Sequence, residues 1–234
     1  MPLQPAHHRE THRLDAIGWL RAGVLGANDG LISTSSLMIG MAAAAAGGTV
    51  VLLAGLAGLV GGALSMGAGE YVSVSAQSDA ETANLAKERW ELANIPEAEH
   101  RELAAIYRQR GLSPALADQV ATELTAHDAL GAHARDELGI TDFSKAQPLL
   151  AAAASAASFA AGALPPLLLA LWLPAAQLAP WLAGMTVALL AGLGALAALL
   201  GGAPPARAAL RVAFWGALAL GITHLAGRWF GALV

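Results

Sequence analysis

Residues 31–69 read LISTSSLMIGMAAAAAGGTVVLLAGLAGLVGGALSMGAG, a stretch without Asp, Glu, Lys or Arg. A second stretch without these charged residues runs from 146 to 206. A helix of about 20 apolar residues crosses a bilayer, so each stretch holds more than one crossing or one crossing with long flanks. Helices of a soluble bundle would instead carry charged stripes. The sequence therefore predicts an all-α membrane protein with several spans.

Glycine and proline divide these apolar stretches into five predicted transmembrane helices. The breaks are the GGT at 47–49, the PAAQLAP at 174–180 and the GGAPPAR at 201–207. The predicted helices cover residues 22–46, 50–75, 148–173, 181–200 and 208–233. An odd number of spans would place the two ends of the chain on opposite sides of the membrane.

The positions of the arginines predict the orientation, because basic residues near span ends favour the cytoplasm. Arginines occur in the N-terminal segment 1–21 and in the connection 201–211, whereas the other two turns carry no charge. We therefore expect a cytoplasmic tail at 1–21. The polar segment 79–147 should also be cytoplasmic. It separates a pair of spans within 22–78 from three spans within 148–234. Arg228, near the far end of the last span, departs from this pattern.

The polar segment 79–147 holds 13 of the 17 acidic residues of the chain. We expect it to form an inserted domain of three helices, at 79–93, 96–110 and 114–138. The residues that mark the helix ends are Pro96, Gly111, Ser113, Pro114 and Gly139. Leu116, Val120 and Leu124 recur every fourth residue, which predicts a buried stripe on the third helix.

Carboxylates in this segment occur in pairs that share a helix face. The pairs are Glu88 with Glu91, Glu99 with Glu102, and His133 with Glu137. Carboxylates together with an imidazole suit Fe²⁺, Mn²⁺ or Zn²⁺, and helical bundles commonly build metal sites in this way. The chain has no Cys, which excludes thiolate sites. The alternative is an ordinary solvated surface, where nearby arginines balance the charge.

Asp29 interrupts the apolar pattern near the start of the first predicted span. A carboxylate inside a span costs on the order of 3 kcal/mol unless it faces protein, water or a cation. The alternative is a helix cap at the membrane surface, with the span beginning at Leu31. That span would be about 24 Å long, which is short for the roughly 30 Å hydrocarbon core. We therefore favour a functional carboxylate, with Asn28 and Gly30 opening the helix locally beside it.

Met66 and Glu70 lie four residues apart and share a face of the second span. A thioether is a soft ligand that favours a transition metal over Ca²⁺ or Mg²⁺. Packing is the alternative role for Met66. Glycines at 55, 58, 62, 67 and 69 indicate a close helix contact nearby. His7, His8 and His12 could also bind metal, although a solvated tail is the more common role for such residues.

Four segments resemble the vacuolar iron transporter family, in its bacterial branch. They are VLGANDGLISTSSLMIG (24–40), GALSMGAGEYVSVSAQSD (62–79), ERWELANIPEAEHREL (88–103) and AHARDELGI (132–140). The resemblance extends from about residue 21 to the end of the chain. It implies a homodimer that exports Fe²⁺, and often Mn²⁺, from the cytosol in exchange for protons. It also implies a cytoplasmic metal-collecting domain and a pathway between the first two spans of each subunit.

By position, Asp29 and Met66 match the residues of the family's translocation path. The metal-binding residues implied in the same way are Glu88, Glu91, Glu99, Glu102 and Glu137. Plant-type members have a glutamate at the position of Gly58 and a methionine at that of His133, whereas they carry glycine at that of Glu70. We therefore expect Glu70 to replace the missing pathway carboxylate and His133, as a metal ligand, to shift the metal preference.

The function expected from the sequence is a proton-coupled exporter of ferrous iron or manganese in the bacterial inner membrane. Zn²⁺ is a further candidate for the cytoplasmic domain. We expect no enzymatic activity, prosthetic group or nucleic-acid partner. The alternative is a membrane-anchored metal-binding or ferroxidase-like protein without transport. Five spans exceed what an anchor needs, and the segment lacks the pair of Glu-x-x-His motifs typical of di-iron bundles.

Overall fold

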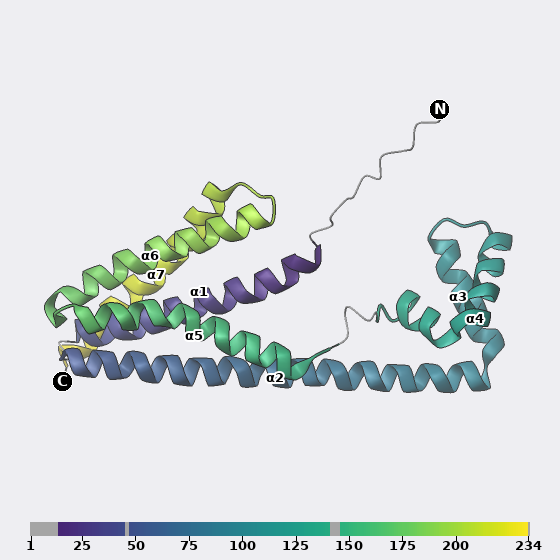
Figure 1. Ribbon diagram of the computed structural model, residues 1–234, viewed down its shortest axis with the longest axis horizontal. Helices are drawn as coiled ribbons and strands as arrows, with labels where there is room; N and C mark the ends of the chain where they lie inside the picture. The colour runs from purple at the N-terminus through teal and green to yellow at the C-terminus, as the bar shows by residue number, and fades with distance from the viewer. Residues whose placement is uncertain (1–13, 45–46, 141–145, 234) are drawn as a thin grey trace, which may run out of the picture. The chain divides into compact units, whose positions relative to one another are not determined.

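A computed structural model describes residues 14–44, 47–140 and 146–233. The described residues form seven helices and no strand (Figure 1). The helices are α1 (Leu14–Ala43), α2 (Gly48–Asn94), α3 (Pro96–Gln109), α4 (Pro114–Asp136), α5 (Pro148–Trp172), α6 (Ala175–Leu200) and α7 (Pro205–Gly231). His7, His8 and His12 lie outside the described residues, as does most of the expected tail at 1–21. The all-α prediction is confirmed.

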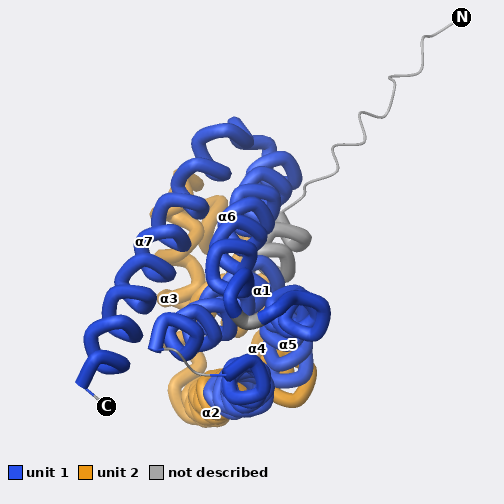
Figure 2. The backbone as a smooth tube through the Cα atoms, turned by 90° about the vertical axis from the view of Figure 1, so that its left-hand side faces the viewer, with its two compact units in different colours: residues 1–69, 152–234 blue, residues 70–151 orange. Residues whose placement is uncertain are grey.

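The chain divides into two compact units, shown in different colours in Figure 2. The first, which we call the apolar unit, comprises residues 1–69 and 152–234. The second, which we call the acidic unit, comprises residues 70–151. The polar end of α2, together with α3 and α4, lies in the acidic unit.

Among the described residues, four helices are long and apolar enough to cross a membrane, namely α2, α5, α6 and α7. The chain is therefore a multi-pass membrane protein. Helix α1 is not among the four, although it packs against both α6 and α7 within the apolar unit. Its polar residues, including Asp29 and the run from Ser33 to Ser36, interrupt its apolar sequence.

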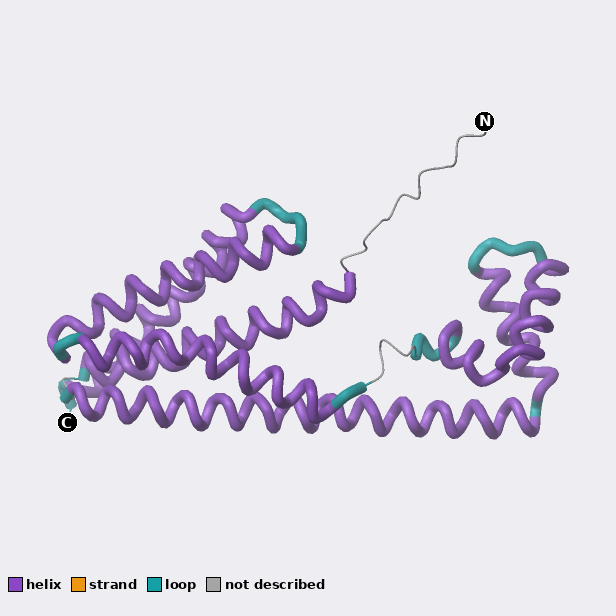
Figure 3. Tube along the Cα trace, in the orientation of Figure 1, coloured by secondary structure: helices purple, strands orange, loops and turns teal. Residues whose placement is uncertain are grey.

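Several helix boundaries differ from the prediction. Helix α1 begins at Leu14 and continues through Asn28, Asp29 and Gly30, so these residues neither cap nor open it. Helix α2 has 47 residues and continues where we expected a break near residues 76–78 (Figure 3). Helix α6 begins at Ala175, which makes most of the expected turn at 174–180 helical. A change from apolar to polar sequence does not break backbone hydrogen bonds, so α2 continues, and α6 contains Pro180 within its helical range.

Small residues allow the helices of the apolar unit to approach closely. Phe159 of α5 is 3% exposed. Its ring occupies the space that a side chain at Gly62 of α2 would need, and its backbone occupies the corresponding space at Gly30 of α1. Gly55 of α2 similarly faces Met38 of α1. The predicted close contact at the α2 glycines is therefore made with α1 and α5 of the same chain.

The acidic unit has a small apolar core between α3 and α4. Leu103 and Ala104 of α3 pack there with Ala121 and Ala132 of α4. The predicted stripe on α4 is confirmed in part, because Leu124 packs against this core, whereas Leu116 is 49% exposed and the neighbouring Ala117 is fully buried. Alanines let the two helix backbones come close, and Leu116 faces outward.

The predicted helix ends of the acidic unit are largely confirmed. Pro96 and Pro114 occupy first turns, and the Ser113 hydroxyl accepts a hydrogen bond from the Leu116 N–H at 3.4 Å. Gly111 and Gly139 have φ values of 99° and 68°, a region that favours glycine. One feature was not predicted: the backbone of Asp128 leaves helical geometry and divides α4 into two helical parts.

Candidate metal site

The structure brings four potential ligand side chains together in the acidic unit. One ligand atom from each of Glu88, Glu99, His133 and Glu137 lies within 4.8 Å of the others. We call these four residues the His133 cluster. Glu88 comes from the polar end of α2 and Glu99 from the first turn of α3, while His133 and Glu137 come from the end of α4.

His133 lies at the centre of the cluster and is fully buried. Its Nδ1 atom is 2.9 Å from Glu137 Oε2, 3.0 Å from Glu88 Oε1 and 3.8 Å from Glu99 Oε2. One imidazole nitrogen carries at most one hydrogen. That hydrogen pairs well with only one of the three carboxylates, and Glu137 has the suitable geometry. The arrangement therefore leaves acceptor capacity that a cation can use.

Glu88 provides the most direct sign that a cation fits. It is 2% exposed, and its Oε1 atom is buried without a hydrogen-bond partner among the described residues. An unpaired buried polar atom costs about 1–3 kcal/mol, and a charged one costs more. A divalent cation bound to Nδ1 in place of its hydrogen would satisfy this oxygen. Carboxylate oxygens with one imidazole form a donor set suited to Fe²⁺, Mn²⁺ or Zn²⁺.

The cluster also perturbs the protonation of its carboxyl groups, which lie outside the apolar stretches of the chain. Burial raises the pKa of Glu88 from 4.5 to about 7, and the negative charge of Glu137 contributes further. Burial likewise raises the pKa of Glu99, with further contributions from Glu102 and Glu91. Without a cation, the Glu88 carboxyl group is therefore partly protonated near neutral pH. An arriving cation would displace this proton.

Two glutamates predicted as ligands lie outside the His133 cluster. Glu91 forms an ion pair with Lys87 at 3.2 Å on the surface of α2. Glu102 is exposed on α3. Their charges still raise the pKa of Glu99, so both are close enough to act on the cluster electrostatically. The equal spacing of the two Glu pairs in the sequence did not distinguish the inward member from the outward one.

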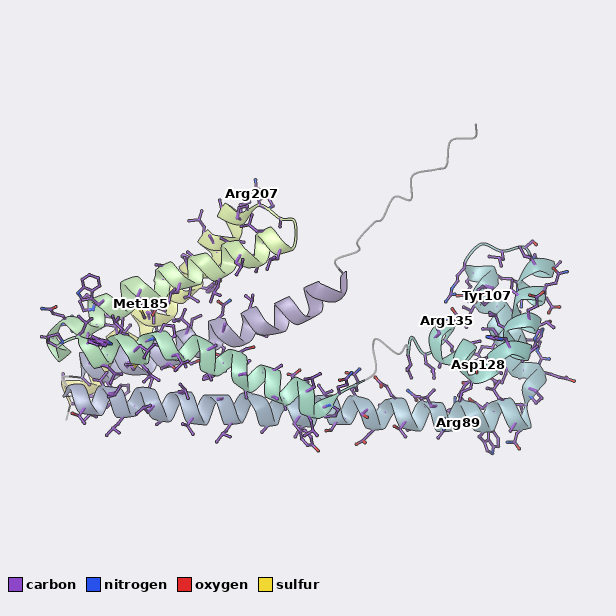
Figure 4. The ribbon with its side chains drawn as sticks, viewed as in Figure 1. Arg89, Tyr107, Asp128, Arg135, Met185 and Arg207 are labelled. Atoms are coloured by element: carbon purple, nitrogen blue, oxygen red, sulfur yellow. The ribbon has the colours of Figure 1, made fainter. Side chains whose placement is uncertain are left out.

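A hydrogen-bond network beside the cluster joins α3 to the end of α4. Asp136 accepts hydrogen bonds from the Tyr107 hydroxyl at 2.9 Å and from Arg110 Nη1 at 2.7 Å. Arg135 Nη2 also donates to Asp136, at 3.1 Å, and Figure 4 labels Tyr107 and Arg135. Burial works to raise the pKa of Asp136, but these three hydrogen bonds lower it overall. The sequence does not reveal this network, because its members lie 26 and 29 residues apart.

The residues predicted for the translocation path lie on α1 and α2. Asp29 is exposed on α1, and its Oδ1 accepts a hydrogen bond from the Ser33 hydroxyl at 2.8 Å. Met66 is half-buried and Glu70 is exposed, both on α2. Among the described residues, Asp29 and Glu70 belong to no group of side chains that could hold a metal. Their assignment to a path remains a prediction.

Comparison with known proteins identifies relatives along nearly the whole chain. The sequence model described as "VIT family" matches residues 20–228. A "Vacuolar iron transporter" of Acanthamoeba castellanii is 49% identical over 94% of this chain and 83% of its own length. "Vacuolar iron transporter homolog 1" of Oryza sativa subsp. japonica is 40% identical over 91% of this chain and 74% of its own length. "Vacuolar iron transporter homolog 2" of Arabidopsis thaliana is 36% identical over 88% and 81%, respectively.

Proposed function

Because the chain belongs to the VIT family, we propose that it exports a divalent metal ion, Fe²⁺ or Mn²⁺, from the cytosol in exchange for protons. The proposed setting is the bacterial inner membrane, with the acidic unit in the cytoplasm. The names of the relatives concern iron. We propose manganese as a further substrate, export as the direction of transport, and coupling to protons.

The observation that carries this proposal is the His133 cluster. A membrane protein with a buried site for a divalent cation is suited to collect that cation before moving it. The unpartnered Glu88 oxygen and the raised pKa values of Glu88 and Glu99 support reversible exchange of a cation for protons at this site. We propose that Glu91 and Glu102, at its edge, attract cations without binding them directly.

We further propose five spans, with α1 crossing the membrane beside α6 and α7, and a path lined by Asp29, Met66 and Glu70. Asp29 is exposed on the apolar unit, where contact with lipid would cost about 3 kcal/mol. A second subunit that covers α1 would remove this cost. This argument supports a homodimer, in which the path runs along the covered faces of α1 and α2.

The alternative is a membrane-anchored metal-binding or ferroxidase-like protein. The His133 cluster contains one histidine, and its three carboxylates come from three separate helix ends. A di-iron bundle instead uses paired Glu-x-x-His motifs on facing helices. The geometry therefore favours collection of a single ion over two-metal oxidation chemistry.

A flux assay with sealed proteoliposomes tests the proposed function. Protein of uniform orientation, with the acidic unit outside, should load Fe²⁺ or Mn²⁺ when the interior is acidic, and the lumen should become more alkaline as metal enters. Asp29→Asn should abolish both signals, because the amide has a similar size but does not titrate. Met66→Leu should reduce metal flux and the coupled alkalinisation in proportion, while the titratable Asp29 carboxylate is kept. Metal binding without flux by the wild-type protein would establish the anchored alternative.

A further inference from the structure

The break in α4 lies between the Ser113 cap and the His133 cluster. At Asp128 the backbone has φ −159° and ψ 87°, which is an extended conformation within an otherwise helical segment. The carboxylate of Asp128 accepts a hydrogen bond from the Gly131 N–H at 3.0 Å. This contact caps the N-terminus of the second helical part, which carries His133. Asp128 is thus an internal helix cap, and Figure 3 shows the end of α4 running in a new direction.

An unbroken α4 would place His133 on the wrong face. The buried face of the first part is marked by Ala117 and Ala121. At 3.6 residues per turn, His133 would lie about 160° around the axis from Ala117, facing away from α3. Asp128 itself would lie within about 20° of Ala117, which would point a carboxylate into the apolar core. The break corrects both positions, because Asp128 is exposed and His133 is fully buried.

Two further features hold the redirected part in place. Asp136 binds Tyr107 and Arg110 of α3, which fixes the end of this part against α3. Gly131 has no side chain, and a Cβ there would overlap the Asp128 carboxylate. The sequence Asp128-Ala-Leu-Gly131 therefore combines a capping acceptor with the glycine that lets the carboxylate approach.

From this geometry we propose that Asp128 is the positioning residue of the metal site. It does not touch the cation but ends the first part of α4, so that His133 turns toward Glu88 and Glu99. The proposal rests on the proposed function only in assigning a metal to the cluster. The placement of His133 by the Asp128 cap can be tested without metal.

The chain offers a matched control for this cap. Ser113 caps the first part of the same helix through the Leu116 N–H, far along the helix from His133. Ser113→Ala should remove a similar amount of helix stability, about 1 kcal/mol, without moving His133. Asp128→Asn keeps a capping acceptor, whereas Asp128→Ala removes the cap and introduces the residue that most favours an unbroken helix.

The metal-free experiment measures the reactivity of His133 in the full-length protein in detergent. Diethylpyrocarbonate modifies accessible imidazoles, and mass spectrometry resolves the peptide that contains His133. We expect slow modification in the wild type, Ser113→Ala and Asp128→Asn, and at least about tenfold faster modification in Asp128→Ala, since the helix would turn the ring outward. Equal rates in Asp128→Ala and Ser113→Ala would overturn the proposal.

The metal experiment uses Co²⁺ alone, titrated calorimetrically into the same full-length variants. Asp128→Ala should weaken Co²⁺ binding by about tenfold, as loss of a residue that orients a metal ligand commonly does. In a protein that already carries His133→Ala, Asp128→Ala should reduce Co²⁺ affinity little further, because both changes remove the same ligand. Additive losses would overturn the positioning role. If Asp128→Ala speeds modification of His133 but the wild type does not bind Co²⁺, the role of Asp128 as a cap would be supported and the metal function would be rejected.

Discussion

Glu99 and Glu102 lie one turn apart on α3 but have different surroundings. Glu99 is 4% exposed within the His133 cluster, whereas Glu102 is exposed outside it. Glu99→Gln removes a charge beside the cation and should weaken Co²⁺ binding by at least about tenfold, since close charges in a buried site interact by several kcal/mol. Glu102→Gln should change it little, because solvent screens the exposed charge. Calorimetry on the two full-length variants makes this comparison, and equal losses would contradict the assignment of Glu99 as the inward ligand.

The pKa of Glu88 predicts how the metal-free acidic unit responds to pH. A folded-state pKa of about 7 against an ordinary 4.5 means that folding disfavours the charged form. Stability should therefore fall as the pH rises from about 4.5 to 7, by at most about 3 kcal/mol. Hydrogen exchange of peptides from α3 and α4, corrected for intrinsic rates, measures this change. Glu88→Gln should remove most of it.

The lowered pKa of Asp136 has the opposite sign and acts at lower pH. Its hydrogen bonds to Tyr107, Arg110 and Arg135 favour the charged form, so its contribution is complete above the ordinary Asp pKa of about 3.9. That contribution is lost as the pH falls below this value. In the metal-free wild type, the protection of α3 and α4 peptides from hydrogen exchange should therefore be greatest between about pH 3.9, below which Asp136 loses its contribution, and about pH 4.5, above which Glu88 begins to destabilise the fold. Protection that rises steadily from pH 5 to pH 8 would contradict the burial of Glu88 as the dominant effect.

At the scale of helices, the sequence predicts ends well where a residue forces them. Pro96, the Ser113 cap and Gly139 all act where we expected, because each has a local preference that packing does not override. The break at Asp128 was missed because the sequence around it contains no proline and could continue as a helix. Packing against the core determines this break, because an unbroken helix would bury Asp128 and expose His133.

The residues of the metal site likewise depend on packing that the local sequence does not reveal. His133 and Glu137 were predicted as a pair from their spacing, and the structure places both in one cluster with Glu88 and Glu99. Spacing on one helix does not show which side chain of a pair points inward, because that choice depends on the helices that pack against it. The sequence therefore predicted all four residues of the His133 cluster, but it also predicted Glu91 and Glu102, which lie outside the cluster.

The contact of Phe159 with α2 gives a prediction at the same scale. A Cβ at Gly62 would overlap the Phe159 ring, whereas a Cβ at Gly61 would meet no atom within 4 Å. Gly62→Ala should destabilise the protein by about 1–3 kcal/mol through overpacking. Gly61→Ala should be neutral or slightly stabilising, since alanine favours a helix more than glycine does. Thermal unfolding in detergent, followed by tryptophan fluorescence, measures the Tm of both variants. An equal decrease in Tm for Gly62→Ala and Gly61→Ala would exclude the close contact of α2 with Phe159.

At the scale of the whole molecule, charge separates the chain into parts suited to two solvents. Four helices are apolar enough to span a membrane, and 13 of the 17 acidic residues lie within 79–147. Helix α1 is not among these four, but it packs against α6 and α7. Neighbouring protein can cover polar residues such as Asn28, Thr34 and Ser35 inside a membrane, and Ser35 indeed pairs with Thr186 of α6 at 2.7 Å. Helix packing thus supports a fifth span that hydropathy alone does not identify.

The absence of cysteine makes this topology directly testable, because single introduced cysteines have no background. We propose exposed positions for labelling: Thr49 before the apolar part of α2, Gln109 at the end of α3, Gln177 near the start of α6 and Ala203 between α6 and α7. With five spans, an impermeant maleimide added to intact cells should label Thr49→Cys and Gln177→Cys, and it should reach Gln109→Cys and Ala203→Cys only after permeabilisation. A cysteine at Ala6 should behave like the second pair, because α1 would separate it from Thr49. Labelling of Ala6→Cys and Thr49→Cys from the same side would show that α1 does not cross, and Asp29 would then lie outside any path through the membrane.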